Sequence, residues 1–255
     1  MADKNPTAAV LIIGNEILSG RTRDSNLNYI AVKLTSVGIK LAEARVVADI
    51  EEHIVRAVNE MRRQYTYVFT TGGIGATHDD ITADSIAKAF GRPIVENPEA
   101  RKRLEAHYTA AKLNAARLRM ARMPEGAQLI DNPVSIAPGF SVENVYVMAG
   151  VPNIMQSMMD HLITTLEHGP TIHMVSIVAQ IPENVVADEL AALAASYADL
   201  DIGSYPWQRE GRWGTTLVVR GTDKAAVQKA SQDVFSMVAR NKGEPKIEET
   251  TLSAA

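Results

Sequence analysis

The stretch TTGGIGATHDD, residues 70–80, connects an apolar run to two adjacent aspartates through a loop that is rich in glycine. Residues 67–70 predict a strand, and residues 81–90 predict a helix that stops at Gly91. Glycine allows the backbone to adopt positive φ and lets a ligand approach without a Cβ in the way. We therefore expect a strand, a nearly bare loop and a helix in succession.

The chain before this stretch shows the same alternation of strand and helix. The run AAVLII, residues 8–13, is apolar throughout, as in a strand that is covered on both faces of a parallel sheet. Asp24 or Ser25 can cap the helix that follows, and Asp49 can cap the next helix. We expect strands at 8–13, 39–47 and 67–70, and helices at 27–37, 50–63 and 81–90.

This alternation predicts an α/β fold with a parallel sheet and right-handed crossovers. Ligands of such sheets bind outside the carboxyl ends of the strands. The loops at Gly14, Asp49 and Gly72 all leave carboxyl ends, so we expect them to converge on one rim.

The second half of the chain changes pattern after His168-Gly169-Pro170. Before this break we expect a basic helix or helix pair at 98–122, short strands at 127–130 and 145–148 joined by the loop NPVSIAPGF, and a helix at 153–167. After the break, strands at 172–181, 201–205 and 214–220 and helices at 183–197 and 223–240 predict a small β-α-β-β-α domain. We place the domains at 1–170 and 171–243, with a disordered polar tail at 244–255.

Composition excludes several classes of protein. The chain has 255 residues, a formal net charge of −4 and no cysteine, which excludes disulfides, zinc–thiolate sites and cysteine nucleophiles. The acidic balance argues against a general nucleic-acid binder. No segment has the eighteen or so consecutive apolar residues that a membrane helix needs. We expect a cytoplasmic protein that binds neither nucleic acid nor membrane.

The glycine turn can aim consecutive backbone N–H groups at a phosphate or carboxylate, helped by the amino terminus of the next helix. A tight turn without any ligand explains the glycines equally well. The acids Asp79, Asp80 and Asp84 favour the ligand, because carboxylates beside a phosphate site suit a divalent metal such as magnesium. Helix capping remains the alternative for each single acid. His78 fits an exposed polar residue better than a chemical one.

One stretch concentrates positive charge. A solvated helix face is the favoured interpretation, and a diphosphate clamp for the same or a neighbouring subunit is the alternative. The cations are Arg101, Lys102, Arg103, Lys112, Arg117, Arg119 and Arg122.

The stretch TTGGIGATHDDITADSIAKAFGRP resembles the signature of the Mog/MoaB-type molybdopterin-binding domain, in the version of the CinA family. It is also similar to the N-terminal domain of eukaryotic FAD synthase. IIGNEILSGRTRDSN, VVADIEEHI, MARMPEGAQLIDNP and NVYVMAGVPNIM resemble the other motifs of this group, and GSYPW at 203–207 resembles its small second domain. Two departures are Ala76, where the group has proline, and Met148-Ala149 before Gly150.

The resemblance implies a three-layer αβα domain with a mostly parallel sheet and a ligand at the glycine loop. It assigns catalytic roles to Asp49 and Asp80 and metal binding to Asp80, Asp79 and Glu16. The predicted substrate-binding residues are Gly14, Asn26, Thr71, Gly72, Gly73, Gly75, Thr77, Thr82, Gly150 and Pro152.

Three functions fit this resemblance. The first is a nucleotide pyrophosphatase that depends on magnesium, manganese or cobalt, with potassium as a further candidate ion, and that cleaves a diphosphate of the ADP-ribose or FAD class. Glu16 and Asn26 match the CinA-like version and favour it. The second is a molybdopterin-binding protein that adenylylates its pterin ligand, and the third is a non-catalytic nucleotide-binding module. The resemblance and the basic helix also predict a homo-oligomer.

Overall fold

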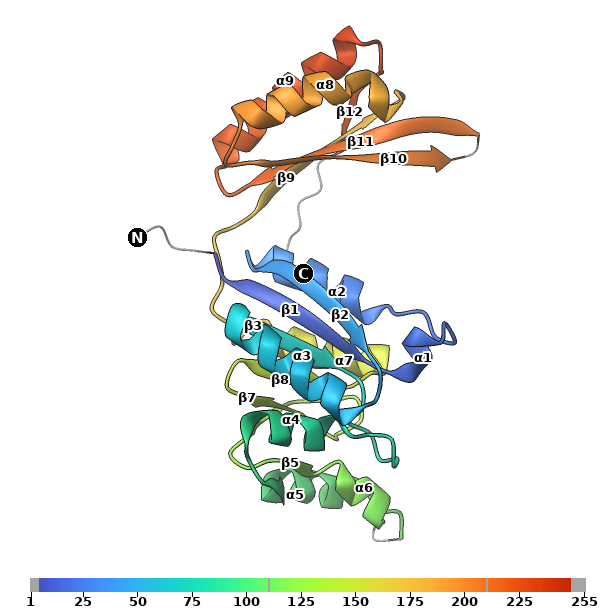
Figure 1. The fold of residues 1–255 in the computed structure, drawn as a ribbon, viewed down its shortest axis with the longest axis vertical. Coiled ribbons are helices and arrows are strands. Elements are labelled where there is room, and N and C mark those ends of the chain that lie inside the picture. Colours follow the sequence, from blue (N-terminus) through green and yellow to red (C-terminus); the bar gives the residue numbers. More distant parts are fainter. Residues whose placement is uncertain (1–4, 110, 210, 249–255) are drawn as a thin grey trace. The chain divides into compact units, whose positions relative to one another are not determined.

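The computed structural model describes residues 5–109, 111–209 and 211–248. The chain divides into two compact units, Met1–Gly169 and Pro170–Ala255, each with its own sheet (Figure 1). Within the described ranges, no helix has both the length and the apolar character that a bilayer span requires.

The first unit is built on a six-stranded sheet in the order β2-β1-β3-β8-β7-β6. The first four strands are parallel, and the last two run antiparallel to their neighbours. The strands are β1 (Thr7–Ile13), β2 (Lys40–Val47), β3 (Tyr67–Thr71), β6 (Gln128–Ile130), β7 (Gly139–Val142) and β8 (Val145–Met148). The mostly parallel sheet predicted from the sequence is confirmed.

Helices cover both faces of this sheet. Along β1, Ala8, Val10 and Ile12 pack in the core cluster that α2 and α7 share. Ala9, Leu11 and Ile13 point to the opposite core, beneath α3 and α4, because side chains alternate along a strand. The result is the expected three-layer αβα arrangement (Figure 1). The helices are α2 (Asn26–Ser36), α3 (Glu51–Gln64), α4 (Thr82–Phe90) and α7 (Pro152–Leu162).

Several short elements differ from the sequence prediction. Of the two predictions for the basic stretch, the helix pair is the one that is present, and each helix is capped by an asparagine side chain, Asn97 and Asn114. The loop expected at NPVSIAPGF ends earlier, because Gly139 and Phe140 pair with Ile130 and Val147 in β7. The two basic helices are α5 (Pro98–His107) and α6 (Ala115–Arg119). The short elements that the sequence did not predict are α1 (Asn15–Leu18), β4 (Ile94–Glu96) and β5 (Arg122–Pro124).

The second unit is a four-stranded antiparallel sheet in the order β10-β11-β9-β12, with two helices packed on it. Its elements are β9 (His173–Ala179), α8 (Glu183–Ser196), β10 (Asp201–Arg209), β11 (Arg212–Gly221), α9 (Lys224–Arg240) and β12 (Lys246–Glu248). The predicted β-α-β-β-α order is present, followed by one extra strand. The prediction of a disordered tail is wrong for residues 246–248. These residues form β12, which pairs with β9 along the edge that β11 leaves open. Residues 249–255 of that tail lie outside the described residues.

The first unit depends on Phe69 in the middle of β3. This side chain is fully buried, and its ring stacks on Tyr146 with centroids 5.3 Å apart. We expect Phe69→Ala to lower the free energy of unfolding by about 3–5 kcal/mol, because it removes a large buried ring and leaves a cavity. Chemical denaturation measures this. Leu18→Ala at a 55% exposed position is the control and should change stability by less than about 0.5 kcal/mol.

Candidate functional site

The carboxyl ends of β1, β2, β3 and β8 meet at one edge of the sheet, which we call the glycine rim and define by Gly14, Asp49, Gly72–Gly75 and Gly150. Backbone hydrogen bonds join neighbouring loops there: Gly14 N–H donates to Val47 O at 3.1 Å, and Gly72 N–H donates to Met148 O at 3.2 Å. The predicted convergence of these loops is therefore present.

The turn after β3 can be built only from glycine. Gly72 has φ +102°, and a Cβ added to it would lie 2.1 Å from Ile13 O. Gly73 has φ +67°, and its Cβ would lie 2.2 Å from the hydroxyl of Thr82. The fully buried Thr82 fixes the turn, because its hydroxyl donates to Gly72 O at 3.0 Å. The predicted binding residue Thr82 thus shapes the loop from beneath.

One narrow pocket on the rim, of about 60 Å³, gathers many of the predicted residues, and we call it the Asn26 pocket. Asn26 is 5% exposed, and its Nδ2 donates to Gly150 O at 2.9 Å. Its Oδ1 is buried and has no hydrogen-bond partner among the residues that the structure describes, which leaves an acceptor for an N–H or O–H group. The predicted residues lining this pocket are Glu16, Asn26, Thr71, Gly72, Gly150 and Pro152.

A second pocket lies across the glycine turn, and we call it the Asp80 pocket. Gly73, Gly75 and Asp80 line it together with Arg119 and Arg122. Arg122 donates to Asp84 at 2.9 Å, so a partner already compensates its charge. No hydrogen bond or ion pair of the Arg119 guanidinium is found in the described part of the chain. Arg119 is the cation best placed to meet a ligand anion.

Most of the other basic residues have local roles. Arg101 donates to Glu96 and Glu105, and Arg103 donates to Glu99 and Asp131. The favoured interpretation, a solvated and paired helix face, fits these cations. The sequence analysis did not distinguish Arg119 from the other cations of this stretch. Only the fold distinguishes it, because the fold places Arg119 beside the glycine turn.

Asp80 closes the glycine loop on itself. Its Oδ2 accepts hydrogen bonds from Thr77 N–H at 2.8 Å and from the Thr77 hydroxyl at 2.5 Å. The side chain of Asp79 is 68% exposed. The nearby side chain of Thr77 and the backbone of Asp79 itself lower the pKa of the Asp79 carboxyl. His78 is 96% exposed, as expected of a polar surface residue.

The predicted metal ligands do not come together. Glu16 lines the Asn26 pocket, Asp80 lines the Asp80 pocket, and Asp79 lines neither. Across residues 5–109, 111–209 and 211–248, no three His, Cys, Asp or Glu side chains lie close enough to share an ion. Any divalent ion at the rim therefore has to take further ligands from water or from a bound phosphate.

Asp49 has a structural contact that the sequence did not indicate. Its Oδ2 accepts the N–H of Asn15 at 2.8 Å, which ties the loop after β2 to α1. The predicted cap of α3 is wrong, since the cap residue is Ile50 and no side chain caps that end. Asp49 lines neither pocket, and its catalytic role stays a prediction.

Comparison with known families decides where the chain belongs. Residues 9–168, well over half of the chain, match the model described as probable molybdopterin binding domain. The chain belongs to the molybdopterin-binding domain family. Residues 171–245 match the model described as FAD synthase, middle domain. The family resemblance deduced from the glycine and aspartate motifs is confirmed.

Individual relatives refine this assignment. A protein from Archaeoglobus fulgidus is 35% identical over 222 residues, which cover 87% of this chain and 93% of the relative. The crystal structure of the protein CinA with unknown function from Thermoplasma acidophilum has a TM-score of 0.60 and 32% identity, over 63% of this chain and 98% of that one. A probable FAD synthase from Caenorhabditis elegans is 30% identical over 239 residues, 84% of this chain and 46% of the relative. The molybdopterin-binding domain here is thus of the CinA type and similar to FAD synthase.

Two glycine positions separate the cost of positive φ from the cost of a steric clash. Gly20 has φ +73° with nothing within 4 Å of an added Cβ, whereas the Cβ of Gly72→Ala would overlap Ile13 O. We expect Gly20→Ala to cost about 1–2 kcal/mol of stability. Gly72→Ala should cost about 1–3 kcal/mol more, because the strand ends must move apart. Thermal denaturation compares the two, and equal losses would show that the rim is not tightly packed.

Proposed function

We propose that the glycine rim binds the phosphate of a phosphorylated pterin, and that the chain handles a molybdopterin-type ligand. The observation that carries this is the turn at Gly72 and Gly73, where backbone without side chains faces the rim beside the amino terminus of α4. The N–H of Gly72 is already donated to Met148 O, but no hydrogen bond from the N–H of Gly73, Ile74 or Gly75 is found among the described residues. N–H groups of such a turn beside a helix start favour an anion. The match of residues 9–168 to a probable molybdopterin binding domain supports the same ligand class.

The two pockets divide the recognition of such a ligand. The Asp80 pocket encloses only about 20 Å³, so the phosphate would lie at its opening. There the Gly73–Gly75 backbone and Arg119 supply the anion contacts. The Asn26 pocket supplies an acceptor, because the unpartnered Oδ1 of Asn26 can take a hydrogen bond from a ring N–H or a hydroxyl. A ligand that carries both a phosphate and such a donor satisfies both sides of the turn.

The presence of both matched domains in one chain favours a second function. The C-terminal unit matches the FAD synthase middle domain, and the probable FAD synthase relative aligns across both units. This supports a diphosphate of the ADP-ribose or FAD class as substrate and a pyrophosphatase as the activity. Asp80 and Glu16 each offer one carboxylate, the usual protein share of a magnesium ion that also binds substrate phosphate. Such an ion supplies Lewis-acid activation of the phosphate.

A binding and turnover panel separates the two functions. The purified chain is incubated with ADP-ribose, FAD and ATP, each with magnesium, manganese or cobalt, and the products are resolved by chromatography. Pterin fluorescence of the purified protein and rescue of molybdoenzyme activity in a Mog-deficient strain test the first function. If the purified protein shows no pterin fluorescence and does not rescue molybdoenzyme activity, the first function is wrong. Metal-dependent release of AMP from ADP-ribose or FAD establishes the second function.

Asp80→Asn tests the rim itself. We expect it to lower pterin binding or turnover at least tenfold, because it removes the charge at the Thr77 contacts and places an N–H₂ group beside Gly75. Calorimetric titration and the product assay measure the effect. Asp188→Asn on the exposed side of α8 is the matched control and should leave both unchanged. Wild-type behaviour of Asp80→Asn would remove Asp80 from the site.

The predicted homo-oligomer is also open to direct measurement. We expect light scattering after size-exclusion chromatography to give a mass that is a multiple of the 27.7 kDa chain. A monomer at micromolar concentration would contradict it, and the basic helices would then serve their own subunit alone.

A further inference from the structure

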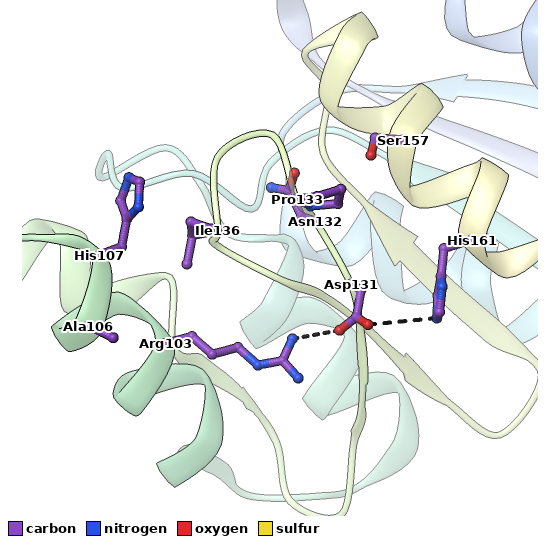
Figure 2. A pocket seen from close by; sticks show the side chains of 9 residues that line it. All are labelled: Arg103, Ala106, His107, Asp131, Asn132, Pro133, Ile136, Ser157 and His161. Atoms are coloured by element: carbon purple, nitrogen blue, oxygen red, sulfur yellow. Dashed lines mark hydrogen bonds and ion pairs between the residues drawn. The ribbon is translucent and has the colours of Figure 1, made fainter.

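A cavity of about 650 Å³ lies at the edge of the first unit, between α5, the loop that follows β6, and α7 (Figure 2). This volume is in the usual range for small-molecule sites. None of its lining residues belongs to the two pockets of the glycine rim. The proposed function leaves this cavity unexplained.

The loop wall of the cavity holds its own shape. Asn132 is 4% exposed, and its Oδ1 accepts the N–H groups of Val134 and Ser135, both at 3.1 Å. Its Nδ2 donates to Ala137 O at 2.8 Å. The side chain of Asn132 is therefore occupied in fixing the loop. Its neighbour Pro133 contributes apolar surface suited to a flat ring.

Three polar side chains form a row along the cavity from α5 to α7 (Figure 2). Arg103 Nη1 donates to Asp131 Oδ1 at 2.6 Å, and Asp131 Oδ2 lies 4.0 Å from His161 Nε2. The hydrogen bond from Arg103 lowers the pKa of Asp131, so the carboxylate is ionised at neutral pH. Arg103 keeps N–H groups beyond those bound to Glu99 and Asp131. Along the row, Arg103 is a hydrogen-bond donor and Asp131 is an acceptor. His161 is a second donor when Nε2 carries a hydrogen.

We propose that this row binds the imide edge of a flat heterocycle, in which a ring N–H lies between two carbonyl oxygens. Asp131 Oδ2 accepts the ring N–H, and Arg103 and a ring N–H of His161 donate to the flanking carbonyls. Uracil and isoalloxazine rings carry this edge. A pterin presents an amino group and a ring N–H beside a single carbonyl, so it matches the row less well.

The inference does not depend on the glycine rim. Riboflavin and uridine carry the imide edge and have no phosphate, so their binding does not need the anion contacts of the rim. The Asp131 and His161 variants described below distinguish binding in the cavity from binding of the ring N–H at Asn26. Loss of pterin or diphosphate binding at the rim leaves this test unaffected, and failure of the cavity test leaves the rim proposal standing.

The decisive experiment changes the ligand and leaves the protein intact. Calorimetric titration of the full chain with riboflavin, uridine and their 3-methyl analogues compares rings that have the central N–H with rings that lack it. We expect at least tenfold weaker binding after methylation, since Asp131 loses its donor and faces a methyl group. The tighter of the two parent ligands identifies the ring class. Equal binding of the methylated ligand, or no binding of either parent, overturns the proposal.

Variants then place the ligand on the row. Asp131→Ala should weaken riboflavin or uridine at least tenfold, and His161→Ala should weaken it about threefold to tenfold. Lys102→Ala, an exposed neighbour of Arg103 on α5 that does not line the cavity, is the matched control and should bind normally. Circular dichroism checks the fold of each variant. Unchanged binding by folded Asp131→Ala would overturn the assignment, and if that variant does not fold, His161→Ala and the methylated ligands decide.

Discussion

The close approach of the strand ends at Gly72 is the constraint on which the rest of the site depends. A Cβ at Gly72 would collide with Ile13 O, and a Cβ at Gly150 would lie 3.2 Å from the Cα of Gly72. The loops after β1, β3 and β8 are thus packed backbone against backbone. Because no side chain fits there, the edge of the sheet presents peptide groups and the start of α4. The proposed binding of an anion at this edge rests on this exposed backbone.

The acids around the rim serve first to hold this geometry. Asp80 binds Thr77 within the loop, Asp49 binds the backbone of Asn15, and Asp84 pairs with Arg122. Arg119 lines the Asp80 pocket and differs from these residues, because its guanidinium has no hydrogen bond or ion pair among the described residues. Under the proposed function, Arg119 and the backbone of the turn are the groups that meet the ligand phosphate.

The loop after β6 lines both the Asp80 pocket and the larger cavity of the first unit. Pro138 near its end lines the Asp80 pocket, whereas Asp131 at its start lines the larger cavity. Asn132 fixes the loop from within through hydrogen bonds to its backbone. A short segment that is neither helix nor strand thereby forms a wall for both places, which is common for binding residues carried on loops of a rigid scaffold.

The sequence by itself determined the alternation of strands and helices, the glycine turn, and the family. These rest on local signals: the wholly apolar run of β1, helical spacing, and glycines that only a positive-φ turn requires. Tertiary structure decided the rest. The short strands β7 and β12 form because a neighbouring strand offers its backbone, and periodicity over three or four residues is too short to show that. The contacts of Asp49 with Asn15 and of Asp131 with Arg103 join segments distant in the chain, and so does the position of Arg119 beside the glycine turn. The type of each residue indicated its chemistry, and only the packed fold decided which residues it meets.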